Sequence, residues 1–317
     1  MRLPNGYTAS PVRMPGDLDD IVQLNADCDL ADVGFEDAAA SHIRAAYDAP
    51  QTDIARDTVV IRAGERIVAT GLCAAMAGGW PDCWGRVHPD HRGLGLGTRL
   101  FEFFERRGAE QVAGGAQPKI VNAFSSTDSA ARALALRRGY ELVRTFWHME
   151  RDLAAVDPDP PVPGGFQVRP VDPARELEAL HACLEEGFAN HYGWVAQPFE
   201  YWMAETFTSE QWDPELAWLA WEGDQLAGAA LSRVADDIGW VGDLAVRRPW
   251  RGRGLGEALL RRSFASLAAK GISICGLNVD AASDTGATRL YERAGMTVRR
   301  AFDLYEKPLA AGLSSQT

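Results

Sequence analysis

The chain has 317 residues, enough for two domains of ordinary size that each bury a core. Its formal net charge of -12 and sequence pI of about 5.0 argue against nucleic acid or an anionic membrane as a partner. The five cysteines lack the spacing of a disulfide framework, which predicts a reducing, cytoplasmic compartment. We expect neither a signal peptide in the first residues nor a membrane-spanning segment, because no apolar run is long enough.

The first half of the chain predicts alternating strands and helices. In chain order these are a strand, a helix capped by Asp17, a hairpin turning at Gly64, and a strand that runs into a glycine-rich turn and a helix. A further strand, a helix and a last strand follow. The expected bounds outside the glycine-rich turn are 8–13 for the first strand, 58–72 for the hairpin, then 119–124, 129–138 and 142–149.

A proline- and glycine-rich stretch at 152–165 interrupts this pattern. Four prolines and two closing glycines cannot continue a helix or a central strand, so the stretch reads as a linker. It predicts an N-terminal domain over 1–151 and a C-terminal domain over 166–317.

The second half repeats the first. Gly64 of the first hairpin matches Gly223, a shift of 159 residues, and Asp128 matches Asp284, a shift of 156 residues. The second half predicts the same elements in the same order. It begins with a strand over 166–169, which is followed by a helix capped by Asp172-Pro173. The chain is therefore an internal repeat of one domain.

The second glycine-rich turn is the most informative stretch. A buried strand over 241–246 ends before Pro249, the sequence Arg251-Gly-Arg-Gly-Leu-Gly256 follows, and 258–270 has the period of a helix. Backbone N–H groups at such a junction converge on an anion, and the helix N-terminus adds positive potential, so a diphosphate is the expected guest. The absence of Lys-Ser/Thr after the glycines argues against a P-loop.

The pattern Arg251-x-x-Gly254-x-Gly256 after a strand ending Leu-Ala-Val resembles the coenzyme A motif of the GNAT N-acetyltransferases. A second motif, Asp284-x-x-Ala-x-x-Leu-Tyr291-Glu, lies where that family would place it. The resemblance covers nearly the whole chain. It implies two tandem α/β GNAT folds, each a mixed central sheet flanked by helices, and acetyl transfer from acetyl-CoA to an amine by direct attack.

The resemblance also implies which residues hold coenzyme A. The pantetheine arm would pair with the strand before each turn, and the diphosphate would lie on the amides of the turn. In the second half these residues are Leu244, Ala245, Val246, Arg251, Gly252, Arg253, Gly254, Leu255, Gly256 and Glu257, with Asp284 near the pantetheine amides. In the first half they are Val87, Arg92, Gly93, Leu94, Gly95, Leu96, Gly97 and Thr98.

Tyr291 occupies the family's tyrosine position, where a phenol can protonate the departing thiolate; a buried tyrosine with one core hydrogen bond is the structural alternative. Some members carry a glutamate base where this chain has Trp240. Asp243 is the nearest carboxylate on that strand, so the base is either Asp243 or a water molecule.

The first half has Ala135 in place of the tyrosine, which predicts a catalytically degenerate copy that either binds coenzyme A or only supports the other half.

The segment after the first helix of the second copy corresponds to the part of GNAT enzymes that covers the acceptor. Its candidate substrate-binding residues are Glu185, Glu186, His191, Tyr192 and Trp194, although a solvated helix end with aromatic anchors explains them as well. Three scattered possible metal ligands are too few for a zinc site, so no metal is expected. They are Cys83, His88 and His91.

Together these features predict an acetyl-CoA-dependent N-acetyltransferase acting on a small-molecule amine, as a monomer or homodimer. Two alternatives remain open. One is a mycothiol synthase-like enzyme that acetylates a cysteinyl amine, which Trp240 in place of the glutamate disfavours. The other is a non-catalytic module that binds acyl-CoA, of which the first copy is an example within the chain. The sequence does not identify the acceptor.

Overall fold

The structure of the protein is a computed structural model that describes the chain except for six short segments. These are 37–39, 76–79, 113–117, 208–211, 284 and 310–317. The chain divides into two compact units. The first contains Met1–Phe146 and Arg300–Thr317, and the second contains Trp147–Arg299.

The first unit is built on a mixed sheet whose strands lie in the order β1-β2-β3-β4-β5-β12-β6. They are β1 (Tyr7–Ser10), β2 (Thr58–Ala63), β3 (Arg66–Ala75), β4 (Pro81–Val87), β5 (Lys119–Ser125) and parts of β6 (Glu141–Asp152) and β12 (Thr297–Pro308). Strands β1 to β4 run antiparallel, β4 and β5 run parallel, and β5 and β12 run antiparallel. The helices are α1 (Leu18–Val33), α2 (Ala40–Asp48), α3 (Ile54–Asp57), α4 (Leu96–Gln111) and α5 (Ser129–Arg137).

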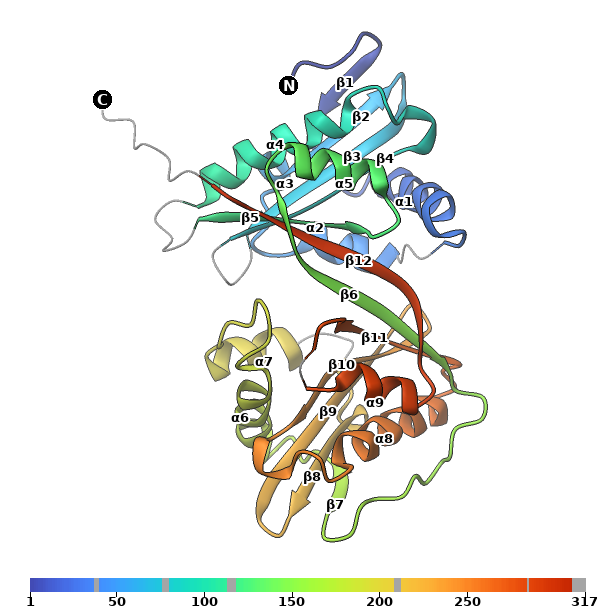
Figure 1. The fold of residues 1–317 in the computed structure, drawn as a ribbon, viewed down its shortest axis with the longest axis vertical. Coiled ribbons are helices and arrows are strands. Elements are labelled where there is room, and N and C mark those ends of the chain that lie inside the picture. The colour runs from blue at the N-terminus through green and yellow to red at the C-terminus, as the bar shows by residue number, and fades with distance from the viewer. Residues whose placement is uncertain (37–39, 76–79, 113–117, 208–211, 284, 310–317) are drawn as a thin grey trace, which may run out of the picture. The chain divides into compact units, whose positions relative to one another are not determined.

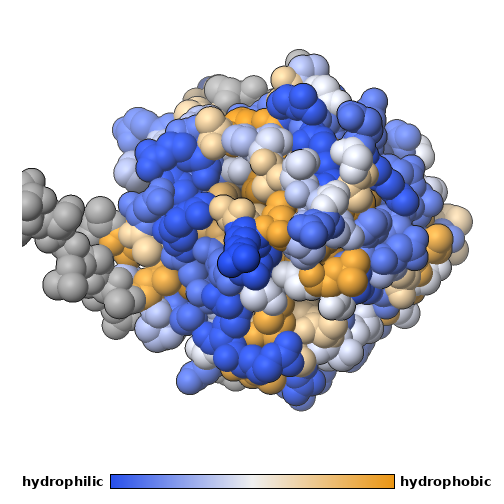
Figure 2. Space-filling view, turned by 90° about the horizontal axis from the view of Figure 1, so that it is seen from above, coloured by the Kyte–Doolittle hydropathy of each residue, from blue (hydrophilic) through white to orange (hydrophobic). Residues whose placement is uncertain are grey.

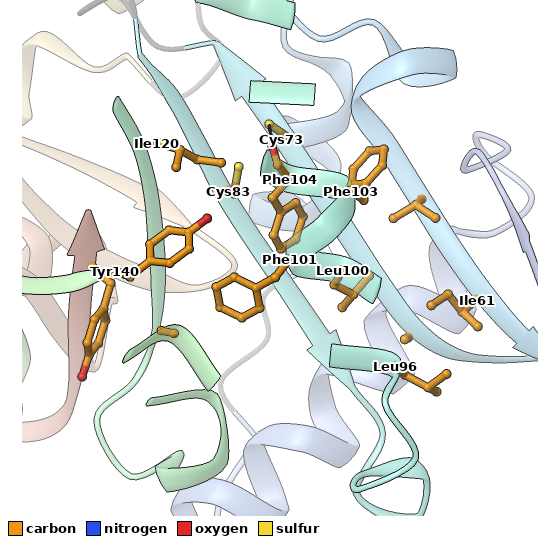
Figure 3. Close-up of a cluster of buried hydrophobic side chains, with 14 of the residues drawn as sticks. Ile61, Cys73, Cys83, Leu96, Leu100, Phe101, Phe103, Phe104, Ile120 and Tyr140 are labelled. Atoms are coloured by element: carbon orange, nitrogen blue, oxygen red, sulfur yellow. Dashed lines mark hydrogen bonds between the residues drawn. The ribbon is translucent and has the colours of Figure 1, made fainter. Parts of the chain in front are cut away.

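Helices cover both faces of this first sheet. On one face α4 presents Phe101 and Phe104 to a core that includes Cys73 and Cys83 of the central strands (Figure 3). On the other face α1 packs onto the sheet through a separate cluster that includes Ile21. The helix α4 forms because its apolar residues recur at helical spacing, and burying that stripe against the strands stabilises it.

The second unit repeats this plan with strands in the order β6-β11-β10-β9-β8-β7. Its strands besides β6 are β7 (Gln167–Pro170), β8 (Ala217–Glu222), β9 (Gln225–Ala235), β10 (Ile238–Val246) and β11 (Ile274–Asp280). Its helices are α6 (Leu177–Phe188), α7 (Phe199–Phe207), α8 (Leu255–Ala269) and α9 (Ala287–Arg293). Residues of α8 pack on one face with Leu277 and Val279 of β11, and residues of α6 and α7 pack on the other with Leu231 of β9.

The last strand of each sequence repeat contributes to both compact units. In β12, Phe302 to Pro308 pair antiparallel with Ser125 to Lys119 of β5, inside the first unit. In β6, the residues from Trp147 onward belong to the second unit, where β6 is the neighbour of β11 (Figure 1). The boundaries predicted at 151 and 166 follow the sequence repeat, whereas the compact units are divided within these two strands.

The predicted α/β architecture with mixed sheets and flanking helices is confirmed in each unit. The cap predicted at Asp172-Pro173 is wrong, because α6 begins only at Leu177 with Glu176 as its N-cap residue. Asp172 instead closes a turn by accepting a hydrogen bond from the amide of Ala174 at 3.0 Å. The carboxylate of Glu176 binds Arg169 and the amide of Asp172, which holds the chain in that turn.

Hydrophilic residues dominate the face drawn in Figure 2, and hydrophobic ones lie there in small separate groups. This pattern agrees with the excess of acidic residues in the composition. Within the described part of the chain, no helix is both long enough and apolar enough to cross a membrane.

Candidate active site

Two neighbouring strands of the second unit separate where the site begins. The parallel strands β10 and β11 pair only at Gly239 with Cys275 and at Trp240 with Gly276. On its other side β10 stays paired with β9 as far as Val246. Beyond Trp240, the edge of β10 that faces β11 therefore has no strand partner among the described residues. An unpaired strand edge is a template for another extended chain, and the resemblance places the pantetheine arm here.

A β-bulge at Gly242 determines which side chains face this gap. Val241 pairs with Ser232 and Asp243 pairs with Leu231, so Gly242 is an extra residue in β10. The bulge puts Asp243 on the face covered by α6 and α7, because its cross-strand partner Leu231 packs with those helices. A Cβ atom on Gly242 would lie 3.1 Å from the guanidinium of Arg233, so a larger residue would disturb this arrangement.

The glycine-rich turn delivers the chain into the N-terminus of α8. Gly252 and Gly254 have φ values of 75° and 80°, which L side chains rarely adopt. Gly254 is the N-cap residue and makes no side-chain cap, so the first amides of the 15-residue helix face outward. A Cβ atom on Gly256 would lie 2.9 Å from Leu290 of α9, so only glycine lets the two helices approach this closely. The turn and helix fit a diphosphate group.

The charged side chains around the turn differ in whether they have a partner of opposite charge. Arg251 donates from Nε to the carbonyl of Val246 at 2.9 Å and has no carboxylate partner among the described residues. Glu257, the acid in the first turn of α8, is held by Arg261 at 2.8 Å. Arg293 lies 3.8 Å from its other oxygen. The carboxylate of Glu257 is thus neutralised by two arginines, and Arg251 is left to attract an anion.

A cavity of about 430 Å³ joins the gap, the turn and the start of α9. The predicted residues that line it are Leu244, Ala245, Val246, Arg251, Gly252, Gly254, Leu255, Gly256, Glu257, His191 and Tyr291. Arg253 does not line it: the side chain pairs with Glu222 at 2.5 Å and lies over the ring of Phe166. Asp284 lies outside the described residues.

Tyr291 stands at the inner wall of this cavity. It lies on α9, is only 9% exposed, and packs into the core formed with α8 and β11. No hydrogen-bond partner of its hydroxyl occurs among the described residues. Burial raises the pKa of Tyr291 to about 12. The phenol is therefore protonated at neutral pH and has its proton available for donation.

Asp243 lies across β10 from Tyr291, because it shares the α6-facing side of the strand whereas Tyr291 packs on the α8-facing side. Burial raises the pKa of Asp243 to about 6, and the nearby charge of Arg233 opposes the shift. The Asp243 side chain does not line the cavity itself. Its carboxylate is a candidate base on the opposite face of β10 from the candidate acid.

The five residues predicted to bind the acceptor differ in whether they line the cavity. Glu185 accepts hydrogen bonds from the indole of Trp194 at 3.3 Å and from the amide of Gln197 at 3.1 Å. Its carboxylate thus holds the loop that follows α6. Glu186 pairs with Arg247 at 2.6 Å. Among the five predicted residues only His191 lines the cavity. Trp194 stacks on Phe188 with centroids 5.0 Å apart, and Tyr192 likewise stays off the cavity wall.

The first unit has a smaller version of the same site, a cavity of about 290 Å³. Seven of the eight predicted residues line it: Val87, Arg92, Gly93, Gly95, Leu96, Gly97 and Thr98. Leu94 points outward and is half exposed. The arginine of this turn, Arg92, is bound by both carboxylate oxygens of Asp32 at 2.7 and 3.0 Å. Ala135 occupies the tyrosine position and is fully buried.

The three residues weighed as metal ligands have other partners. Cys83 is buried in the core beneath α4. His88 contacts Asp27 and Arg66 at 3.2 and 2.7 Å, and His91 binds the hydroxyl of Tyr7 at 2.8 Å. In the part of the chain that the structure describes, no three ligating side chains are grouped so that they could hold a metal ion.

Two polar residues at the site escaped the sequence analysis. Asn278 of β11 lines the cavity, and its side chain contacts His148 of β6. A polar residue between Leu277 and Val279 in a buried strand was a visible signal, because it indicates a face turned away from the core. His148 gave no comparable signal, since the sequence assigns it to the first repeat.

Comparison with known proteins defines the class of this site. The profile of the acetyltransferase (GNAT) family matches residues 19–140 and again residues 181–296, and the chain belongs to this family. Members of this family take acyl-coenzyme A donors, and the paired matches agree with a tandem arrangement.

The chain is similar to several proteins named mycothiol acetyltransferase. The one from Geodermatophilus obscurus is 33% identical over 230 residues, which cover 69% of this chain and 70% of that protein. The one from Kineococcus radiotolerans is 31% identical over 304 residues, 93% of this chain and 94% of that protein. Among solved structures, a GCN5-related N-acetyltransferase from Sphaerobacter thermophilus has a TM-score of 0.89 and 32% identity and covers 98% of both chains.

Proposed function

We propose that the protein transfers an acetyl group from acetyl-CoA directly to the amine of a small molecule, and that the second unit carries the working site. The observation that supports the proposal is that one cavity joins a strand edge, a glycine-rich turn with outward amides and a protonated tyrosine. Neither the edge nor the tyrosine hydroxyl has a partner among the described residues. A glycine-rich turn that served only to connect a strand to a helix would not need to share a cavity with the other two features.

The residues of the second unit suit coenzyme A. The outward amides of Leu255 to Glu257 would hold the diphosphate with help from Arg251, and the free edge at Leu244 to Val246 would pair with the pantetheine arm. When bound, the coenzyme supplies a thioester carbon that an amine can attack, so that a C–N bond forms and the C–S bond breaks.

The two candidate proton-transfer residues have complementary states at neutral pH. Tyr291 holds its proton and would give it to the departing sulfur. Asp243, whose pKa is raised to about 6, is mostly ionised at pH 7 and would accept the proton that the amine loses, directly or through water. Their positions on opposite sides of β10 separate the acid from the base.

A narrower candidate for the acceptor is the cysteinyl amine of the unacetylated form of mycothiol. The similarity to proteins named mycothiol acetyltransferase, including one matched over 93% of this chain, favours it. Trp240 stands where some family members carry a glutamate base, so the proposal assigns that role to Asp243. A reducing cytoplasm suits such a thiol, and all five cysteines of the chain are buried and free.

Calorimetry with acetyl-CoA tests the proposal and the assignment of the working site. Gly256→Trp should abolish binding at the second turn, because even a Cβ atom there meets Leu290. Gly97→Trp is the matched change in the first turn, where a Cβ atom would lie 3.3 Å from Leu134. We expect Gly256→Trp to remove both binding and acetylation of the cysteinyl amine, and Gly97→Trp to retain acetylation. Wild-type protein that binds no acetyl-CoA would refute the proposal.

A further inference from the structure

A residue from the first sequence repeat lies inside the site of the second unit. His148 of β6 is 2% exposed, and its ring lies 5.1 Å from that of Trp240. A Cβ atom on Gly276 of β11 would lie 3.0 Å from the imidazole, so the glycine makes room for the ring. Because the imidazole is covered, it cannot touch a substrate and can act only through a neighbour.

That neighbour is Asn278. The Nδ1 atom of His148 lies 3.1 Å from Oδ1 of Asn278, and the Nε2 atom lies 3.0 Å from Oε1 of Glu150. Both partners are oxygen atoms, so in this arrangement each ring nitrogen is placed to donate, Nδ1 to Asn278 and Nε2 to Glu150. Arg299 lies 3.8 Å from the second oxygen of Glu150.

These contacts fix the orientation of the Asn278 carboxamide. Its oxygen faces His148, so its amino group is left for the cavity, which Asn278 lines from an exposed position. Asn278 follows Gly276, the last residue of β11 that pairs with β10, by two positions. It therefore lies on the β11 side of the gap, beyond the point where β10 and β11 separate.

The first unit provides an internal comparison. Asn122 occupies the position equivalent to Asn278, a shift of 156 residues, but it is 3% exposed and its Nδ2 atom is buried without a hydrogen-bond partner among the described residues. Its register partner is Tyr305, which packs into the core beneath α4. Both asparagines line the cavity of their unit, but Asn122 is buried whereas Asn278 is exposed, and among the described residues only Asn278 has a histidine beside its side chain.

We propose that His148 is a positioning residue that orients Asn278, so that the Asn278 amino group donates a hydrogen bond to the acyl oxygen of the bound thioester. This inference rests on the proposed function and adds a donor that neither the turn nor Tyr291 supplies. A donor aimed at the acyl oxygen polarises the carbonyl and stabilises the negative charge that develops on it. The ligand class is an acyl-CoA rather than free coenzyme A, because only the former has that oxygen.

Paired titrations of acetyl-CoA and of coenzyme A test the inference without any acceptor. A hydrogen bond of typical strength to the acyl oxygen makes acetyl-CoA bind about five-fold more tightly than coenzyme A. Asn278→Ala and His148→Leu should each lose this preference, while the affinity for coenzyme A itself and the thermal unfolding temperature change little. The leucine copies Leu304, the residue equivalent to His148 in the second repeat. If His148→Leu does not fold, His148→Gln takes its place.

The double variant separates positioning from a general structural role. If His148 acts through Asn278, adding His148→Leu to Asn278→Ala should cause no further loss of preference. Met149→Leu is the matched control, because Met149 is buried on the opposite face of β6; it should keep the preference. All these changes lie in the second unit, so any binding by the first unit contributes equally to every titration.

Two results would overturn the inference. One is a preference for acetyl-CoA that survives in Asn278→Ala or in His148→Leu. The other is a wild-type protein that binds both ligands equally, which would leave the proposed coenzyme site intact. Failure to bind coenzyme A at all would instead refute the proposed function together with the inference, so the two failures are distinguishable.

Discussion

The two glycine-rich turns have nearly the same sequence and different surroundings. In the second turn Arg251 has no carboxylate partner among the described residues, whereas in the first turn Asp32 binds Arg92 through both oxygens. Beside the first turn, Arg86 also reaches Asn25 and Asp29 of α1, at 3.4 and 3.3 Å. The first unit thus keeps the turn, but its arginines make internal contacts with α1 that Arg251 does not make among the described residues.

A single extra residue accounts for a second difference. Strand β10 carries the bulge at Gly242, whereas the pairing of β3 with β4 shows no register shift. Side chains alternate along a strand, so one extra residue transfers those on its far side to the opposite face. A Cβ atom on Gly108 of α4 would lie 3.1 Å from Pro81 of the first unit. Trp240, its equivalent by the shift of 159 residues, instead lies beside His148 on the face away from α8. The bulge thus moves the side chains that precede Gly242 to the opposite face of the sheet.

The largest expected effect comes from removing the hydroxyl group of Tyr291, a group that the first unit lacks because it has Ala135 at this position. Tyr291→Phe removes the proton donor and keeps the ring in its core, so we expect kcat to fall by about 10²–10⁴-fold. The affinity for acetyl-CoA measured by calorimetry should stay within about two-fold, since the phenyl group preserves the packing. A variant with full turnover would assign the proton transfer to another group.

Asp243→Asn is expected to have the next largest effect. In the wild type, kcat/KM should rise about ten-fold per pH unit up to the pKa of Asp243, about 6, and then level off, because only the ionised carboxylate accepts a proton. The asparagine variant should lose this rising limb and about 10²-fold in rate. An unchanged pH profile in Asp243→Asn would favour a water molecule as the base.

The smallest expected effects distinguish the two arginines. Arg251→Ala should weaken acetyl-CoA binding by about ten-fold, because an exposed charged donor to a phosphate is lost. Arg92→Ala should leave acetyl-CoA binding at the second turn unchanged. It should lower the unfolding temperature of the protein, because Asp32 loses its partner. If Arg92→Ala weakened acetyl-CoA binding and Arg251→Ala did not, the first turn would be the coenzyme site.

The sequence predicted the turns, the hairpins and the repeat, because glycines, prolines and hydrophobic period carry that information locally. It did not predict the bulge, since Gly242 reads as one more residue of a buried strand. Nor did it show that β6 and β12 each run through both units, because the alternation in 142–149 is the same whichever sheet the strand joins. Asn278 and His148 depend on both features, and so the pair became visible only in the structure.

The path of β12 has a consequence for how the protein is made. Residues 302–308 pair with residues 119–125, so the sheet of the first unit contains contacts about 180 residues apart in the chain. Such distant pairings close late, because a long loop must be ordered before they form. During synthesis the edge of β5 stays without its partner until nearly the whole chain has left the ribosome. We expect a fragment that stops in the linker at 152–165 to expose that edge and to aggregate, although it contains one complete sequence repeat.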